Sequence, residues 1–257
     1  MNIAGRAFDG SKRPYVVGVV NLSPESPNQD SIAADAAAAV ERARRLTELG
    51  TDLIDVGSQS SWFEAPLLPV DEEIARLLPA VRALKSAGYL VSVDTFRAQA
   101  AQAAIDAGAD VLNDSDGFQD AAIIAVLSRW GGPVILPFIS GPSPHEPIPF
   151  NYEDPMADIE PSLRAAVDRA HAAGLHDLIL DPGTGYRYRD VSAADKERYQ
   201  IKVYDALPRL RALGHPLLVA LPRKDDPART LELIRMIAHY AEFVRAHDPT
   251  VLRQALA

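Results

Sequence analysis

The chain contains no cysteine among its 257 residues. This absence excludes a disulfide framework, a thiolate metal site and a cysteine nucleophile. No apolar run reaches the roughly 18 residues of a membrane-spanning helix, and the first residues form no apolar leader, which predicts a cytoplasmic protein without a membrane partner. Positive charge is also scarce: 26 Lys and Arg oppose 35 Asp and Glu, giving a net charge of −9. Nucleic-acid binding is not expected, since phosphate contacts need a basic face.

The remaining composition is that of an ordinary globular protein, with 47% hydrophobic and 24% charged residues. The length allows one large domain or two small ones, and a core large enough to need no covalent staple. Because no Gly/Ser linker or charged block divides the chain, we expect a single domain over residues 1–257. Nothing in the sequence decides between a monomer and a homodimer.

Short apolar segments that are nearly continuous in hydrophobicity recur along the chain, as expected of strands buried on both faces. The predicted strands are Tyr15–Val20, Asp52–Val56, Tyr89–Val93, Asp110–Leu112, Val134–Phe138, Asp177–Leu180, Pro216–Ala220 and Glu242–Val244.

Amphipathic patterns rich in Ala, Leu, Arg and Glu lie between these segments and predict helices. They cover Ala33–Leu49, Asp71–Ala87, Arg97–Ala107, Pro155–Ala173 and Ala193–Leu213, and a glycine follows each of them, as is common at helix ends. Parallel strands require such crossover helices. About eight strand–helix units in this length favour a (β/α)₈ TIM barrel over an open doubly wound sheet.

In such a barrel, the active site is built at the carboxyl ends of the strands. Polar residues stand at most of the predicted strand ends: Asn21, Asp55, Asp94, Asn113, Asp181, Lys224, Arg245 and His247. Each has an ordinary structural explanation when taken alone. Asp94 resembles a helix cap, Asp181 with the Pro-Gly that follows resembles a turn, and Lys224 resembles part of a solvated charge run. Their occurrence at successive strand ends favours a functional site.

Seven segments around these strand ends form a further pattern: Val17–Ser26, Asp55–Ser61, Ser92–Thr95, Ala107–Asp114, Leu180–Gly185, Pro222–Lys224 and Arg245–Asp248. They resemble signatures of the dihydropteroate synthase family, in the right order and spacing from residue 15 onward. The resemblance implies the same barrel and a reduced pterin as ligand, held by Asp94, Asn113, Asp181 and Lys224, with Arg223 along the ring face. A carboxylate suits the paired N–H donors of a pterin edge. Asp94, Lys224, Arg245 and His247 are the candidate catalytic residues.

The chain departs from the family pattern around the second substrate and the diphosphate. Ser61-Trp62 stands where the family has Thr-Arg, Pro137-Phe138 replaces Met-His, and Pro222 replaces a serine. We therefore assign Asn21, Ser61, Trp62 and Phe138 to the second substrate and the loops around it. Asn21 is a ligand for Mg²⁺ only if a diphosphate is used.

These departures favour a divergent transferase that takes a reduced folate, methylene- or methyl-tetrahydrofolate, and passes a one-carbon unit to a small acceptor. On this hypothesis, little dihydropteroate is expected from pterin diphosphate and 4-aminobenzoate. Two alternatives remain: a genuine dihydropteroate synthase, and a catalytically inactive pterin-binding protein.

Overall fold

The computed structural model describes residues 1–9, 14–149, 151–186, 191–222 and 226–256. Its strands are β1 (Asn2–Ile3), β2 (Arg6–Ala7), β3 (Tyr15–Asn21), β4 (Leu53–Gly57), β5 (Val91–Thr95), β6 (Val111–Asp114), β7 (Val134–Pro137), β8 (Leu178–Asp181), β9 (Leu218–Ala220) and β10 (Phe243–Ala246). Its α-helices are α1 (Ala36–Glu48), α2 (Val70–Ser86), α3 (Ala98–Asp106), α4 (Ala121–Trp130), α5 (Met156–Ala172), α6 (Ala193–Asp205), α7 (Leu207–Arg211), α8 (Pro227–Ala238) and α9 (Thr250–Leu256).

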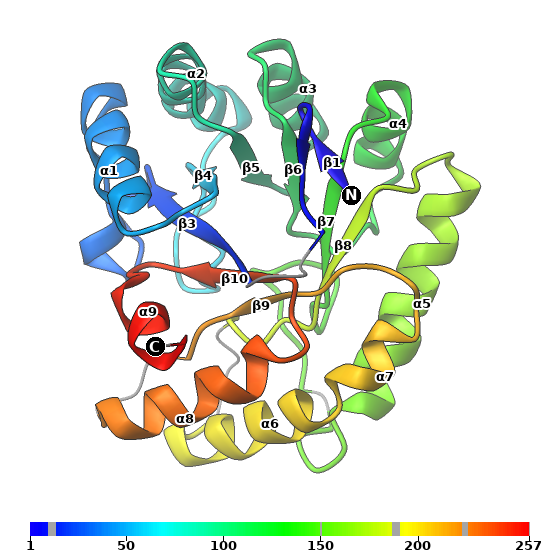
Figure 1. The fold of residues 1–257 in the computed structure, drawn as a ribbon. Coiled ribbons are helices and arrows are strands. Elements are labelled where there is room, and N and C mark those ends of the chain that lie inside the picture. Colours follow the sequence, from blue (N-terminus) through cyan, green and yellow to red (C-terminus); the bar gives the residue numbers. More distant parts are fainter. Residues whose placement is uncertain (10–13, 150, 187–190, 223–225, 257) are drawn as a thin grey trace.

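Eight parallel strands form one sheet in the order β8-β7-β6-β5-β4-β3-β10-β9. Strand β3, the first of these eight along the chain, pairs with β10, the last along the chain, and Tyr15 lies opposite Phe243. A parallel bridge between Leu180 and Leu217 joins the two remaining edges. The sheet therefore curls into a barrel, and helices surround it (Figure 1). The (β/α)₈ barrel predicted from the sequence is confirmed.

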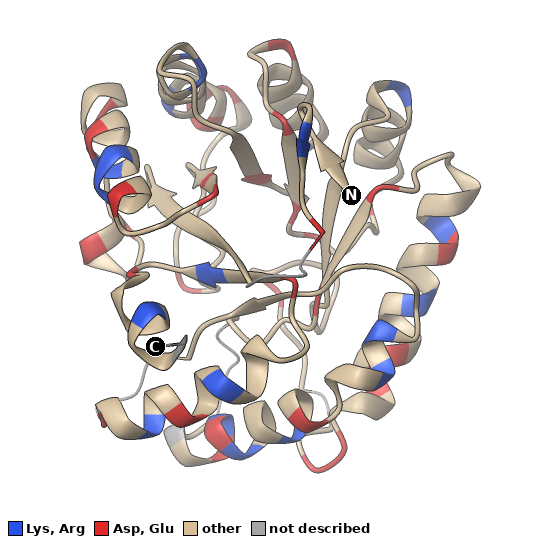
Figure 2. Cartoon of the chain, in the orientation of Figure 1, with Lys and Arg blue, Asp and Glu red and all other residues tan. Residues whose placement is uncertain are grey.

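Charged residues are distributed along the outer helices (Figure 2). Buried apolar residues of these helices pack on the barrel. All five predicted helices are present, but the one expected over Ala193–Leu213 is divided into α6 and α7. The two helices are divided at Ala206, and α7 has Pro208 in its first turn. Because proline has no backbone N–H to donate, Pro208 cannot continue the hydrogen bonding of α6. The short helices α4, α8 and α9 were not predicted.

The amino-terminal half of the barrel interior is filled by apolar side chains, and most of the strands contribute one of them. This cluster is formed by Ile3, Phe8, Val17, Leu53, Val111, Ile135, Ile179, Leu218 and Phe243. Two of its members, Ile3 and Phe8, come from the β1–β2 hairpin and the residue after it. Phe8 lies 4.7 Å from Tyr15 and 5.6 Å from Phe243 between ring centroids. The hairpin therefore closes the amino-terminal end of the barrel.

A layer of polar side chains follows this apolar layer toward the carboxyl ends of the strands. Because side chains in a strand alternate between two faces, the residue two positions further along points into the same interior. On four strands, the residue two positions after an apolar one is polar: Asp55 follows Leu53, Asn113 follows Val111, Asp181 follows Ile179 and Arg245 follows Phe243. The barrel thus changes from apolar to charged at the carboxyl ends of its strands.

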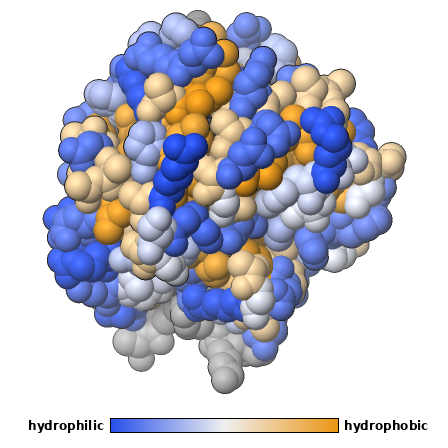
Figure 3. Space-filling view, turned by 90° about the horizontal axis from the view of Figure 1, so that it is seen from above, coloured by the Kyte–Doolittle hydropathy of each residue, from blue (hydrophilic) through white to orange (hydrophobic). Residues whose placement is uncertain are grey.

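The outer surface is mixed in character. From the side shown in Figure 3, hydrophobic residues occur in small separate areas among hydrophilic ones. Within the described parts of the chain, every helix is too short or too polar to traverse a lipid bilayer.

Candidate active site

The deepest part of the site is a hydrogen bond between two buried side chains, Asp55 on β4 and Asn113 on β6. Asn113 Nδ2 donates to Asp55 Oδ2 over 3.1 Å. Among the described residues, neither Asp55 Oδ1 nor Asn113 Oδ1 has a hydrogen-bond partner. Since buried polar atoms are normally paired, these two oxygens are available to N–H donors of a ligand.

Asp181, at the end of β8, joins this layer to Arg245 on β10. Its Oδ2 lies 3.2 Å from Arg245 Nη2, and its Oδ1 accepts the backbone N–H of Gly183 over 2.8 Å. Burial raises the pKa of Asp181, and Arg245 and the Gly183 N–H partly oppose that rise. Burial alone would lower the pKa of Arg245. The negative charges nearby, Asp181 first among them, outweigh burial and raise the pKa of Arg245. Asp181 therefore both builds the turn expected after β8 and orients Arg245.

Asp94, at the end of β5, is not a helix cap. Helix α3 begins at Ala98, and its N-cap residue is Arg97. The Asp94 side chain instead faces the cavity at the barrel mouth. Burial, and next the negative charge of Asp55, raise the pKa of Asp94 from 3.8 to about 7. A carboxyl group with this pKa can accept or donate a proton near neutral pH.

A cavity of about 120 Å³ opens above the polar layer. Its walls come from the ends of β3, β4, β5 and β10 and from the loops after β3, β4 and β8. They include Asn21, Asp55, Trp62, Asp94, Arg245 and His247. Tyr186, from the loop after β8, lies on the wall as well. The floor is thus acidic, and two aromatic side chains stand on its walls.

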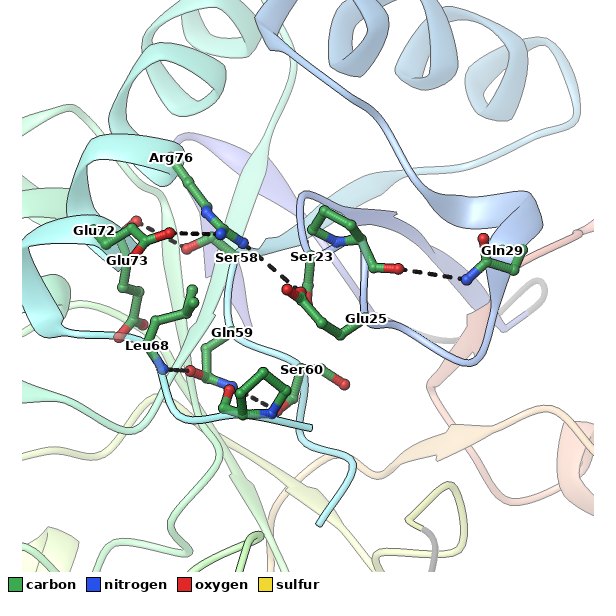
Figure 4. A network of polar contacts seen from close by, with 12 residues as sticks. Ser23, Glu25, Gln29, Ser58, Gln59, Ser60, Leu68, Glu72, Glu73 and Arg76 are labelled. Carbon is green, nitrogen blue, oxygen red and sulfur yellow. Dashed lines mark hydrogen bonds and ion pairs between the residues drawn. The ribbon is translucent and has the colours of Figure 1, made fainter. Parts of the chain in front are cut away.

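The loop that carries Trp62 is held in place by a network of polar contacts (Figure 4). Gln59 bonds to three backbone groups of the same loop, those of Ser60, Pro66 and Leu68. Arg97 donates to the Leu68 carbonyl over 2.6 Å and to Glu73 over 3.0 Å. Because the loop is fixed at several points, the Trp62 backbone has a defined position beside the cavity.

The loop after β3 also lines the cavity and is connected to the same network. Ser23 donates to Glu25 over 2.8 Å, and Glu25 lies 3.7 Å from Arg76 on α2 (Figure 4). Asn21 Nδ2 donates to Ser26 over 3.1 Å and to Ser31 over 2.5 Å.

Those two bonds leave the Asn21 carbonyl oxygen as the part of the side chain that can meet a cation. Within the described residues, no group of three His, Asp or Glu could hold a metal ion. Mg²⁺ commonly binds through few protein oxygens together with substrate phosphates. The residues present therefore fit Mg²⁺ only if Asn21 shares it with a diphosphate, which would supply the remaining oxygens.

The cavity brings together six of the residues predicted from the sequence, namely Asn21, Ser61, Trp62, Asp94, Arg245 and His247. Asn113 and Asp181 do not line the cavity themselves but are bonded to two residues that do, Asp55 and Arg245. Phe138 is placed differently: its side chain lies in the hydrophobic core with those of Val134 and Leu136, which share its side of the chain, and it does not line the cavity. Arg223 and Lys224 lie outside the described residues.

Asp55 is the residue that the sequence-based assignment missed. It stands at a predicted strand end, but no role was given to it. The signal was available, since Asp55 lies two positions after the buried Leu53 and must share its inward face.

A family model described as "Pterin binding enzyme" matches residues 17–248. The chain belongs to the pterin-binding enzyme family. A dihydropteroate synthase of Synechocystis is 31% identical over 265 residues, which cover 96% of this chain and 89% of the relative. A dihydropteroate synthase of Clostridium beijerinckii is 29% identical and covers 96% of this chain and 94% of the relative. The resemblance noted from the motifs is confirmed, and the protein is a dihydropteroate-synthase-like transferase of this family.

Solved structures agree with this assignment. The Yersinia pestis dihydropteroate synthase, in complex with a sulfonamide drug, superimposes with a TM-score of 0.85 at 27% identity and covers 100% of this chain and 96% of that one. The Xanthomonas albilineans enzyme with 4-aminobenzoic acid has a TM-score of 0.79 at 30% identity, covering 95% and 91% of the two chains.

Proposed function

We propose that this pterin-binding enzyme is a dihydropteroate synthase. It would join the methylene carbon of a reduced pterin diphosphate to the amine of 4-aminobenzoate. The bond from carbon to the diphosphate oxygen breaks, a carbon–nitrogen bond forms, and the amine loses a proton. The long matches to relatives of that name favour this reaction over the one-carbon transfer expected from the sequence. A cytoplasmic location and the absence of a nucleic-acid partner stay predictions.

The observation that carries the proposal is the polar layer with its unpaired oxygens. Asp55 Oδ1 and Asn113 Oδ1 are buried acceptors without a partner among the described residues. A pterin ring presents adjacent N–H donors along one edge, and acceptors fixed in advance bind such an edge without reorganisation. We assign the pterin head to Asp55, Asp94, Asn113 and Asp181, and Asp94 to proton transfer near the ring.

The remaining site residues are assigned to the other end of the substrate. Arg245 and His247 line the same cavity and carry the positive charge or N–H donors that a departing diphosphate needs. Asn21 is assigned to Mg²⁺ bound with that diphosphate. The aromatic side chain of Trp62 offers a surface on which the aminobenzoate ring can stack.

Folate-dependent one-carbon transfer remains the second candidate, because Trp62 lines the cavity in place of the arginine of the family motif. An indole cannot offset the charge of a diphosphate, whereas it can stack on the aminobenzoyl ring of a folate.

The deciding experiment supplies purified protein with a pterin diphosphate, 4-aminobenzoate and Mg²⁺ and measures dihydropteroate. We expect Mg²⁺-dependent product formation. Isotope-labelled methylene- and methyl-tetrahydrofolate with candidate acceptors form the second arm. Label transfer without any dihydropteroate would replace the proposal with the one-carbon reaction, and binding without either product would indicate an inactive pterin-binding protein.

The variant Asp181→Ala tests the assignment of the pterin head. It removes a charge-assisted acceptor, so calorimetry should show pterin affinity reduced by about tenfold or more. The matched control is Asp205→Ala, which alters an exposed carboxylate at the end of α6. Unchanged pterin affinity in Asp181→Ala would show that the pterin lies elsewhere.

A further inference from the structure

Arg42, on helix α1, makes an arrangement of hydrogen bonds that the proposed function does not use. Its Nε donates to the Val19 carbonyl over 2.8 Å, Nη1 to the Asp30 carbonyl over 2.6 Å, and Nη2 to the His247 carbonyl over 2.9 Å. All three nitrogens of the guanidinium are therefore used, each on a different segment of the chain.

The three segments meet on one side of the cavity. Val19 belongs to β3, Asp30 lies in the loop that follows β3, and His247 follows β10. Val19 and His247 line the cavity themselves. Asn21, which also lines it, lies between Val19 and the loop, and its amide bonds to Ser26 and Ser31 of that loop. Arg42 thus connects the β3 and β10 sides of the barrel mouth from outside the cavity.

The choice of residue fits this task. Arginine presents N–H donors in a rigid planar fork, whereas lysine offers three donors from a single atom and cannot reach three divergent carbonyls. Arg42 is partly buried, and burial lowers its pKa. Arg44, on the same helix, is about half exposed and pairs with Glu41 and Glu48. The two arginines therefore differ: Arg44 makes surface ion pairs, while Arg42 joins backbone segments.

We propose that Arg42 is a positioning residue that sets Asn21 and His247 for the half of the substrate that leaves, without affecting recognition of the pterin ring. The groups assigned to the ring stand on β4, β5, β6 and β8, and the three hydrogen bonds of Arg42 described above reach none of these strands. The identity of the leaving group rests on the proposed function, whereas the fixation of the loop does not.

The test compares Arg42→Gln and Arg42→Lys with the matched control Arg44→Gln. Hydrogen–deuterium exchange, measured without ligand, should be faster in Arg42→Gln over residues 22–32 and 246–248 and unchanged in the control. Dihydropteroate formation should show kcat reduced by about tenfold or more, while calorimetry shows the affinity for 6-hydroxymethylpterin unchanged within about twofold. Arg42→Lys, which keeps the charge and part of the bonding, should lie between Arg42→Gln and wild type.

Two outcomes would overturn the inference: unchanged exchange in both segments, or a loss of pterin affinity that matches the loss of rate. The exchange measurement needs no catalysis, so it tests Arg42 even if wild-type protein forms no dihydropteroate. A wild-type protein that forms no dihydropteroate would contradict only the proposed function.

Discussion

The carboxyl group of Asp94 makes the protein sensitive to pH at the scale of a single residue. Burial and the nearby Asp55 raise its pKa from 3.8 to about 7. Between these two values the folded protein keeps a proton that the unfolded chain has lost, so the contribution of Asp94 to stability falls as pH rises. For one proton, this fall cannot exceed about 1.4 kcal/mol per pH unit.

Replacing Asp94 with Asn removes the charge and should remove this pH dependence. We expect the Tm of Asp94→Asn to exceed that of wild type at pH 8, and the gain to be smaller at pH 5. Thermal unfolding of both proteins at the two pH values measures the effect, and Asp205→Asn is the exposed control. An equal gain at both pH values would contradict the raised pKa.

At the scale of elements, the loop between β4 and α2 depends on one buried glutamate. Glu73 is fully buried, accepts from Thr95 over 2.7 Å, and pairs with Arg97 over 3.0 Å. Burial raises the pKa of Glu73, while Thr95 and Arg97 counteract the rise. Arg97 in turn holds the Leu68 carbonyl, so Glu73 reaches the loop through Arg97.

The variant Glu73→Gln leaves the Arg97 charge without its partner. We expect a loss of about 3 kcal/mol in the free energy of unfolding, the usual result when one member of a buried pair is removed. The KM for the second substrate should rise because Trp62 stands on the loosened loop. Urea unfolding and steady-state kinetics measure both effects. Glu72→Gln, at an exposed ion pair with Arg76, should cost less than about 1 kcal/mol, and an equal cost would refute the argument.

At the scale of the whole molecule, the amino-terminal hairpin stabilises the barrel from the end opposite the site. Phe8 is 3% exposed and packs on Tyr15 and Phe243. Phe8→Ala should lower the free energy of unfolding by about 3–5 kcal/mol, as large-to-small core changes do, and leave pterin affinity unchanged. Leu67→Ala, at a side chain that is 57% exposed, is the control with little expected effect. Reduced pterin affinity in folded Phe8→Ala would mean that the two ends of the barrel are coupled.

The sequence predicted the barrel well because its strands are marked by apolar runs and its crossovers by helices that end at glycine. The strand ends also indicated several residues of the cavity wall, among them Asn21, Asp94 and Arg245. The hairpin was missed because β1 and β2 have only two residues each, too few for a periodic pattern. Phe138 was assigned to the second substrate from its place at a strand end, whereas its side chain shares the core-facing side of Val134 and Leu136. Arg42 was missed because its partners are backbone carbonyls, which leave no pattern in the sequence.

The pairing of β3 with β10 has a consequence for how the protein is made. Translation proceeds from the amino terminus, so β3 emerges from the ribosome long before β10, the strand that covers its open edge. At the usual rates of synthesis, this interval is on the order of tens of seconds. During that time the nascent chain exposes an unpaired, strongly apolar strand edge, which is a site for aggregation. Production of this barrel in cells should therefore depend on chaperones that shield the growing chain until β10 is complete.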